Sequence, residues 1–263
     1  MEEEEEINDL IKQRASVIAE DYIDYFPESW EGMYFKECSK PIKVDYVYFY
    51  QAQVALSLVI EISRDPAKIH TRQCLLDVGS RFTTVAAMAT MIPTTYVEAR
   101  PLDQRHSANY PQSGLQYIRG EAQSLPCADG EYDVVTSLHA LEHFGLGRYG
   151  DTLDYYGDQK GLQEFSRVLK SNGTLILSVP SAPTTHMQFN RQRMYSPEDI
   201  TSMVVSAGFK VEHEVHIMPF FDRIDTPGSR STFALSHSRE EFAAVKSQNG
   251  AMNTAVLLCA RKI

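Results

Sequence analysis

Two histidines four residues apart are the side chains in this sequence best suited to move a proton. They frame the segment His139-Ala140-Leu141-Glu142-His143, which directly follows the apolar run Tyr132–Leu138. Residues four apart lie on one face of an α-helix, so a helix here would present both imidazoles together. Histidine titrates near neutral pH, which suits it to general base catalysis. We predict that His139 or His143 acts in catalysis or contacts a substrate, and packing of one ring in the core is the alternative.

Acidic and small residues follow three other apolar runs. The first run ends in Asp77-Val78-Gly79-Ser80, the second carries Glu98, and the third is followed by Glu121-Ala122. A glycine at such a corner lets the chain turn sharply and brings backbone N–H groups close to a ligand. A carboxylate about 20 residues beyond that turn can accept both hydroxyls of a ribose. An acid followed by a small residue suits the edge and the face of an adenine.

A polar segment after a fifth apolar run is the second candidate region. Arginines there can pair with a carboxylate or a phosphate on a ligand. A surface loop with structural ion pairs is the alternative. Ser196 before Pro197, with Asp199 close behind, predicts the start of a helix. The predicted substrate-binding residues of this segment are His186, Asn190, Arg191, Arg193 and Tyr195.

The elements that must position these residues follow from the alternation of short apolar runs with helical stretches. This alternation is typical of βαβ units, so we predict an α/β fold, Rossmann-like and doubly wound, with a mostly parallel sheet and helices on both faces. In such a sheet, ligands bind beyond the carboxyl ends of the strands. Strands are expected at 74–78, 95–99, 117–119, 132–138, 174–179, 211–217 and 254–260, and helices at 82–92, 158–170 and 197–207.

The first quarter of the chain has a different character. Residues 7–26 and 50–63 have helical spacing of apolar residues, and residues 30–50 are rich in aromatic side chains. We therefore expect an N-terminal helical, aromatic-rich cap at residues 1–65. The aromatic stretch either packs in the core or roofs the pocket. The Rossmann-like domain would span residues 66–263, with a long insertion at about 218–252.

This order of corners resembles the class I S-adenosylmethionine-dependent methyltransferases, close to the methyltransferase type 11 group. The resemblance covers about residues 72–215. The sequence is also similar to a less characterised branch of that superfamily. It rests on L-D-V-G-S-R at 76–81, on H-A-L-E-H-F-G-L-G-R-Y-G-D at 139–151, and on the helix-turn-strand phrase at 165–175.

The resemblance implies a cofactor and a reaction. The cofactor would be S-adenosylmethionine, with S-adenosylhomocysteine as product, and the acceptor a small polar molecule methylated at oxygen rather than nitrogen. A sugar, a glycan precursor or a secondary metabolite is expected by family association alone. His139 or His143 would then serve as base or orienting group. Ordered from the methionine end through the ribose to adenine, the cofactor-binding residues would be Asp77, Gly79, Ser80, Glu98, Glu121 and Ala122; the alternative for the acids Asp77 and Glu98 is that each caps a helix or a turn.

The glycine motif departs from the family. The usual pattern is D-x-G-x-G-x-G, but Arg81 and Thr83 stand where the second and third glycines are expected. The tail of the cofactor must lie differently, or the Arg81 side chain must point away. The loss also argues against a dinucleotide oxidoreductase, which needs these glycines for the pyrophosphate. A catalytically degenerate cofactor-binding or scaffold protein of the same fold is the alternative.

A zinc hydrolase is a third reading, because residues 139–143 also spell H-x-x-E-H. It needs a helix that presents His139 and His143 to the metal, with Glu142 beside it and a further acidic ligand downstream. The strand expected just before these residues is explained by the methyltransferase fold and not by a protease. We therefore predict no metal.

Composition excludes several kinds of partner. The net charge of −10 and pI near 5.3 argue against nucleic acid, which requires a positive surface. No stretch approaches the roughly 20 apolar residues that span a membrane. The acidic run Glu2–Glu6 is unlike the basic start of a signal peptide. With four scattered cysteines, these features predict a soluble, cytoplasmic protein that acts on a small-molecule substrate.

Overall fold

The computed structural model describes residues 46–64, 73–101, 114–188, 191–220, 232–236, 238–240 and 254–263 of the 263-residue chain. All of these belong to one compact unit, Asp45–Ile263. The helix predicted at 7–26 and most of the aromatic-rich stretch at 30–50 lie outside the described residues. Among the described residues, no helix is both long enough and apolar enough to cross a bilayer.

The central sheet has the order β3-β2-β1-β4-β5-β10-β8-β9. Neighbouring strands from β3 to β5 are parallel, and β10 lies antiparallel between β5 and β8. The prediction of a Rossmann-like, mostly parallel sheet is therefore confirmed. The strands are β1 Leu75–Val78, β2 Thr94–Glu98, β3 Leu115–Arg119, β4 Tyr132–Leu138, β5 Leu169–Pro180, β8 Phe209–Phe220, β9 Thr232–Ser236 and β10 Ala255–Lys262.

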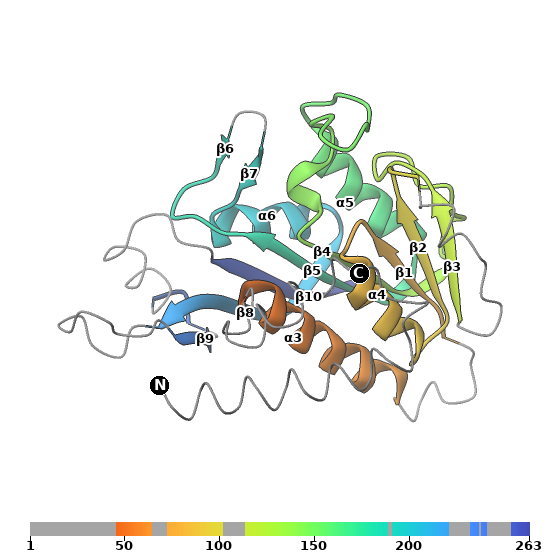
Figure 1. Cartoon of the computed structure of the whole chain (residues 1–263), viewed down its shortest axis with the longest axis horizontal. Helices are drawn as coiled ribbons and strands as arrows, with labels where there is room; N and C mark the ends of the chain where they lie inside the picture. The colour runs from red at the N-terminus through yellow and green to blue at the C-terminus, as the bar shows by residue number, and fades with distance from the viewer. Residues whose placement is uncertain are drawn as a thin grey trace, which may run out of the picture. The chain divides into compact units, whose positions relative to one another are not determined.

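Helices cover both faces of this sheet, with α3 and α4 on one side and α5 and α6 on the other (Figure 1). Successive side chains of a strand point to opposite faces. Leu75 packs in the cluster that contains residues of α3 and α4, and Leu76 packs in the cluster that contains residues of α5 and α6. Burial on both faces is why the central strands are continuous apolar runs. The helices are α3 Tyr46–Ser63, α4 Phe82–Ala89, α5 Gly157–Val168 and α6 Pro197–Ser206.

The sequence signature at Ser196 correctly predicted where a helix begins. Helix α6 begins as predicted: the Ser196 hydroxyl accepts a hydrogen bond from the Asp199 amide at 3.1 Å, and Pro197 occupies the first turn. In the predicted insertion at 218–252, β8 continues to Phe220 and β9 pairs with it. Other parts of that insertion lie outside the described residues.

The helix predicted at the two histidines is wrong. The amide of His139 donates to the Ser178 carbonyl at 2.8 Å and so extends the pairing of β4 with β5. The chain then turns at His139 itself, whose φ is 53°. Only a short 3₁₀ turn, η3 Leu141–His143, follows. A β-hairpin, β6 His186–Gln188 and β7 Gln192–Met194, forms where the sequence indicated a loop.

Candidate functional site

A pocket lies at the carboxyl ends of the parallel strands. Five of the predicted site residues line it, and they come from four different corners of the chain. Gly79 follows β1, Glu98 ends β2, Ala122 follows β3, and His139 and His143 follow β4. The sequence separated these residues by up to 64 positions, and the parallel arrangement brings them together.

The floor of the pocket is bare backbone. Gly79 has φ of 76°, and its amide donates to the Val97 carbonyl at 3.0 Å. A Cβ atom at this position would lie 2.9 Å from the Cβ atom of Ala140. Gly120 is equally crowded, because a Cβ atom there would lie 2.8 Å from Cδ of Pro126. Only glycine combines this backbone conformation with close approach of a ligand.

Asp77 and Ser80 lie beneath this floor instead of facing the pocket. Asp77 is fully buried, and its Oδ1 accepts from the Ser80 amide at 3.1 Å. Its Oδ2 accepts from the hydroxyls of Ser80 at 2.7 Å and Thr136 at 2.5 Å. Burial raises the pKa of Asp77 to about 6, against the effect of these hydrogen bonds. Through these hydrogen bonds the two residues attach the turn that follows β1 to strand β4. This attachment shapes the floor of the pocket.

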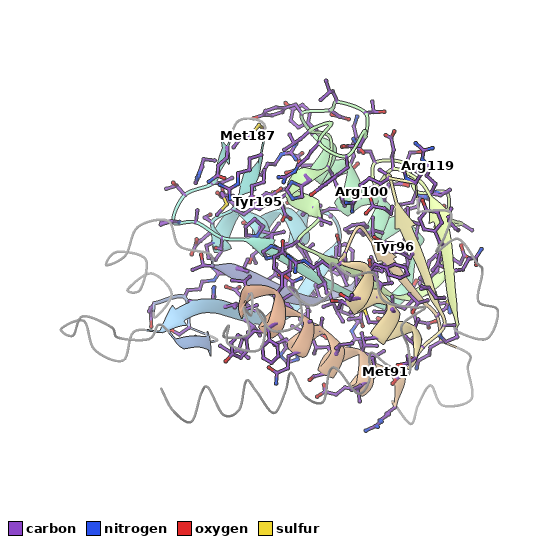
Figure 2. All side chains as sticks on the ribbon, viewed as in Figure 1. Met91, Tyr96, Arg100, Arg119, Met187 and Tyr195 are labelled. Atoms are coloured by element: carbon purple, nitrogen blue, oxygen red, sulfur yellow. The ribbon has the colours of Figure 1, made fainter. Side chains whose placement is uncertain are left out.

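Glu98 faces the pocket with its carboxylate already paired. The Arg100 guanidinium donates to it at 2.5 Å, the Arg100 amide at 3.2 Å and the Tyr96 hydroxyl at 3.1 Å. Tyr96 lies within β2, and Arg100 follows the last residue of that strand by two positions (Figure 2). Burial opposes ionisation of Glu98, but the hydrogen bonds and the charge of Arg100 outweigh it and lower its pKa. Glu98 is therefore an anion ready to accept hydrogen bonds.

Arg100 also lines the pocket. Its guanidinium carbon lies 4.5 Å from the ring centroid of Tyr149, another pocket residue. The remaining cavity is about 60 Å³, well below the roughly 300 Å³ of the smallest ordinary ligand pockets. A cavity of this size does not hold a nucleoside, so lining side chains must move before one can enter.

Arg81 does not obstruct the pocket, although it replaces a glycine of the family motif. Its guanidinium carbon lies 3.3 Å from the ring centroid of Tyr48 in α3, a cation–π contact. The same ring also contacts His139, with ring centroids 5.1 Å apart. Tyr48 therefore directs Arg81 toward α3 and packs against the candidate base at the same time.

The two histidines are neutral at physiological pH. Burial lowers the pKa of His139 to about 3 and that of His143 to about 4, assisted by the charges of Arg81 and Arg148 respectively. The Glu142 carboxyl lies between the rings, and burial raises its pKa to about 8. His139, at the turn, adopts a left-handed backbone conformation. This conformation costs a non-glycine residue about 1 kcal/mol or more, and residues that adopt it are concentrated at functional sites.

The zinc-hydrolase alternative lacks its helix. It requires His139 and His143 on one helical face, but η3 starts only at Leu141. Within the described parts of the chain, no group of three or more histidine, cysteine or acidic side chains is placed to hold a metal ion.

Two of the predicted substrate-binding residues are structural instead. The Arg193 guanidinium donates to the carbonyls of Phe144 at 2.7 Å and Tyr155 at 2.9 Å, and lies 3.4 Å from the Asp158 carboxylate. The Tyr195 hydroxyl donates to Asp158 at 2.9 Å. Arg193 is 5% exposed and Tyr195 1%. Arg193 ties β7 to the segment before α5 and to Asp158 in α5, and Tyr195, which follows β7, binds the same Asp158, so their polar groups are not available to a substrate.

The other predicted residues of this region have different places. Arg191 contributes its backbone, because its carbonyl accepts from Arg148 at 2.9 Å and lies 3.0 Å from Nδ1 of His143. His186 is exposed on β6, with Nδ1 2.9 Å from the Thr184 carbonyl. Asn190 lies outside the described residues. Glu121, a predicted adenine contact, accepts from the amide and hydroxyl of Thr152 at 3.2 and 3.1 Å, so its carboxylate faces the loop.

A glycine-rich loop supplies pocket residues that the sequence analysis missed. Gly145, Gly147 and Gly150 all have positive φ, between 68° and 81°. The Asp151 carboxylate accepts from the amides of Gly145 at 2.7 Å and Tyr149 at 3.3 Å. This fold of the loop brings Tyr149 and Asp151 to the pocket. The spacing of the glycines was the signal that could have identified the loop.

Replacing Glu142 with glutamine should change how stability depends on pH. The folded protein holds a proton on Glu142 between about pH 4.5 and 8, whereas the unfolded chain has released it. The stability contributed by this proton is therefore complete below pH 4.5 and lost as the pH rises to 8. We expect the free energy of unfolding of Glu142→Gln, relative to wild type, to increase by up to about 1.4 kcal/mol per pH unit in this window. Urea unfolding at several pH values measures it, and a constant difference would contradict the raised pKa.

Comparison with known proteins gives one family model and one curated relative. The family DUF268, described as a Caenorhabditis protein of unknown function, matches residues 122–215. A 2-phytyl-1,4-naphtoquinone methyltransferase from Synechocystis sp. is 25% identical over 131 residues, which are 50% of each chain. The chain thus matches about half the length of this relative.

Several solved structures have a fold similar to that of this chain, and two of those described here are assigned as methyltransferases. A protein from Bacillus halodurans C-125 assigned as a methyltransferase has a TM-score of 0.52 at 19% identity, covering 80% of this chain and 99% of the other. One from Galdieria sulphuraria assigned as a sarcosine dimethylglycine methyltransferase has a TM-score of 0.52 at 14% identity, covering 81% and 86%. The cyclase SpnF has a TM-score of 0.51 at 17% identity, covering 80% and 82%. The described chain has the fold of class I methyltransferases.

Proposed function

We propose that this chain, which has the class I methyltransferase fold, binds S-adenosylmethionine and transfers its methyl group to a small polar acceptor. One observation carries the proposal: Gly79, Glu98, Ala122 and His139 line a single pocket at the strand ends where that fold binds ligands. The methyltransferase that matches half of the chain supports it.

The residues of the pocket fit the parts of this cofactor. The bare backbone at Gly79 accommodates the methionine end, because any side chain there would meet Ala140. Glu98 accepts the ribose hydroxyls once Arg100 has moved away, and Ala122 leaves room for the face of adenine. When bound, S-adenosylmethionine supplies a methyl carbon activated by its sulfonium. The protein contributes alignment of the acceptor and a place for its proton.

We infer an oxygen acceptor, such as a hydroxyl of a sugar, a glycan precursor or a secondary metabolite. A hydroxyl must lose a proton as it is methylated, and neutral histidines are available to accept it. His139 and His143 both line the pocket, and their lowered pKa values keep them unprotonated. Release of S-adenosylhomocysteine in the presence of phenols, sugars and hydroxycarboxylic acids tests this acceptor class.

A second candidate is a protein of this fold that binds the cofactor without methyl transfer, or binds no cofactor. Two observations favour it: the Arg100 guanidinium already donates to the Glu98 carboxylate, and the cyclase SpnF has a similar fold. Calorimetry with S-adenosylmethionine and S-adenosylhomocysteine separates the candidates. Heat with both and turnover with an acceptor supports the methyltransferase, whereas no heat at millimolar concentration contradicts it.

Replacing Glu98 with alanine should weaken binding of S-adenosylmethionine by about 1–3 kcal/mol, or roughly 5- to 150-fold. The change removes the carboxylate that would accept the ribose hydroxyls. Isothermal titration calorimetry measures the affinity. Glu212→Ala is the control, because that carboxylate pairs with Arg261 at 3.0 Å outside the pocket. Equal affinity of Glu98→Ala and wild type would refute the ribose assignment.

A further inference from the structure

The Glu142 carboxyl is buried between the two pocket histidines. Its Oε1 lies 3.7 Å from Nδ1 of His139 and 3.7 Å from Nε2 of His143. Its Oε2 has no hydrogen-bond partner among the described residues, and the residue is 1% exposed. A buried carboxyl with so few partners costs stability, so its presence calls for a functional explanation.

The contacts of His143 determine which of its nitrogens faces Glu142 as an acceptor. Nδ1 of His143 lies 3.0 Å from the Arg191 carbonyl, which can only accept a hydrogen bond. Nδ1 therefore carries the hydrogen. In a neutral ring this leaves a lone pair on Nε2, which is the nitrogen directed at Glu142. Glu142 can satisfy this lone pair by holding a proton.

His139 presents the complementary arrangement. Its Nδ1 is the nitrogen near Glu142, and its Nε2 is buried without a hydrogen-bond partner among the described residues. The ring lines the pocket and also contacts the ring of Tyr48. If Nδ1 carries the hydrogen toward Glu142, Nε2 keeps a lone pair, and this nitrogen can accept a proton from an acceptor molecule once the pocket opens to admit it.

We propose that His139 is the catalytic base and that Glu142 is its positioning residue, in a relay that ends at His143. This inference rests on the proposed methyl transfer and assigns the proton path within it. Glu142 fixes the hydrogen of His139 on Nδ1 and stabilises the imidazolium that forms when Nε2 is protonated. His143 takes up the proton that Glu142 then releases.

The step balances in atoms and charge. The acceptor oxygen forms a bond to the methyl carbon as the sulfur–carbon bond breaks and its electron pair returns to sulfur. The hydroxyl proton moves to Nε2 of His139, and the Glu142 proton moves to Nε2 of His143. The site gains one positive charge while the sulfonium loses one, so the net charge of the pocket stays constant.

Nearby charges show why a carboxylate is needed. The rings are buried, a charged His143 and Arg81 both disfavour a positive charge on His139, and Arg148 disfavours one on His143. The two imidazolium rings that the relay creates therefore need an anion between them, and Glu142 is the acidic side chain that ion-pair contacts place beside both. The separations of 3.7 Å exceed a hydrogen bond. Such contacts commonly shorten only when the reacting complex forms.

Nuclear magnetic resonance of the ¹⁵N-histidine-labelled full chain tests the arrangement without cofactor or acceptor. Long-range proton–nitrogen correlations identify which ring nitrogen carries the hydrogen. We expect the hydrogen on Nδ1 of both His139 and His143. A hydrogen on Nε2 of His139 would overturn the proposal, because that nitrogen could not then accept a proton.

Turnover of Glu142→Gln tests the role of the carboxyl. Glutamine keeps the size and polarity but cannot become an anion, so we expect kcat to fall at least tenfold with the most active acceptor of the panel. KM for that acceptor and the affinity for S-adenosylmethionine should stay unchanged. Glu214→Gln is the matched control, because Glu214 lies 2.9 Å from Nε2 of His216, a histidine–glutamate pair outside the pocket.

The outcomes separate this inference from the proposed function. An unchanged kcat in Glu142→Gln overturns the relay and leaves methyl transfer intact. Failure of the wild type to bind S-adenosylmethionine in calorimetry overturns the proposed function, whereas the position of the histidine hydrogens is still measured in that protein. A rise in KM or a fall in cofactor affinity without a change in kcat assigns Glu142 a structural role and also overturns the relay.

Discussion

Replacing His139 with asparagine is expected to lower turnover by about 10²- to 10⁴-fold, the usual contribution of a general base. The affinity for S-adenosylmethionine should remain as in wild type, because the imidazole acts on the acceptor and not on the cofactor. Asparagine is chosen because it tolerates the left-handed backbone that His139 adopts at φ of 53°. Initial rates of S-adenosylhomocysteine formation and calorimetry measure the two quantities.

The control for this variant is Asn172→Gly. Asn172 is the other described non-glycine residue with positive φ, at 60°, and it lies in β5 away from the pocket. Relaxing the backbone there should leave turnover unchanged. If His139→Asn kept wild-type turnover, the base would be another group, and His143 would be the first to examine, because its ring also lines the pocket.

Replacing Arg193 with methionine is expected to lower the free energy of unfolding by about 3–5 kcal/mol, the cost of removing one partner from a buried pair. Methionine keeps much of the side-chain volume but leaves the carbonyls of Phe144 and Tyr155 and the carboxylate of Asp158 without the guanidinium. For a chain of this size, the melting temperature should fall by roughly 6–20 °C. Urea unfolding and thermal denaturation measure the effect.

This result would distinguish a structural arginine from a substrate ligand. A ligand role predicts a higher KM for the acceptor with unchanged stability, which would contradict the burial of Arg193. Arg261→Met is the matched control, because Arg261 forms a partly exposed ion pair with Glu212 on the sheet. Such a pair contributes only about 0–1 kcal/mol, so this variant should unfold close to wild type.

Some features of the site could be predicted from the sequence because local pattern determines them. The apolar run 132–138 is the whole of β4, and the glycine after β1 is at the floor of the pocket. The parallel sheet then required that Gly79, Glu98, Ala122 and the histidines meet at one edge. The cap at Ser196 also lies where its signature indicated. In each case the signal lies within a few residues of the feature that it predicts.

Other predictions failed for reasons that no local pattern contains. The spacing of His139 and His143 fits a helix, but β4 continues its pairing to His139 and leaves only a 3₁₀ turn. Arg193 and Tyr195 have the side chains of a ligand site, yet Asp158, more than thirty positions earlier, takes up both. Arg100 was not among the predicted site residues, although it lines the pocket and its guanidinium donates to Glu98.

The sequence by itself determined the strands, the helices and the corners where chemistry can occur, because burial on one or two faces leaves a periodicity of two or 3.6 residues along the chain. Only the tertiary structure decided which polar groups remain for a ligand. Tyr48 turns Arg81 away from the glycine floor, and Glu142 faces His139 and His143. These pairings depend on distances between segments that the fold brings together, and hydrogen bonds and charges act only at those distances.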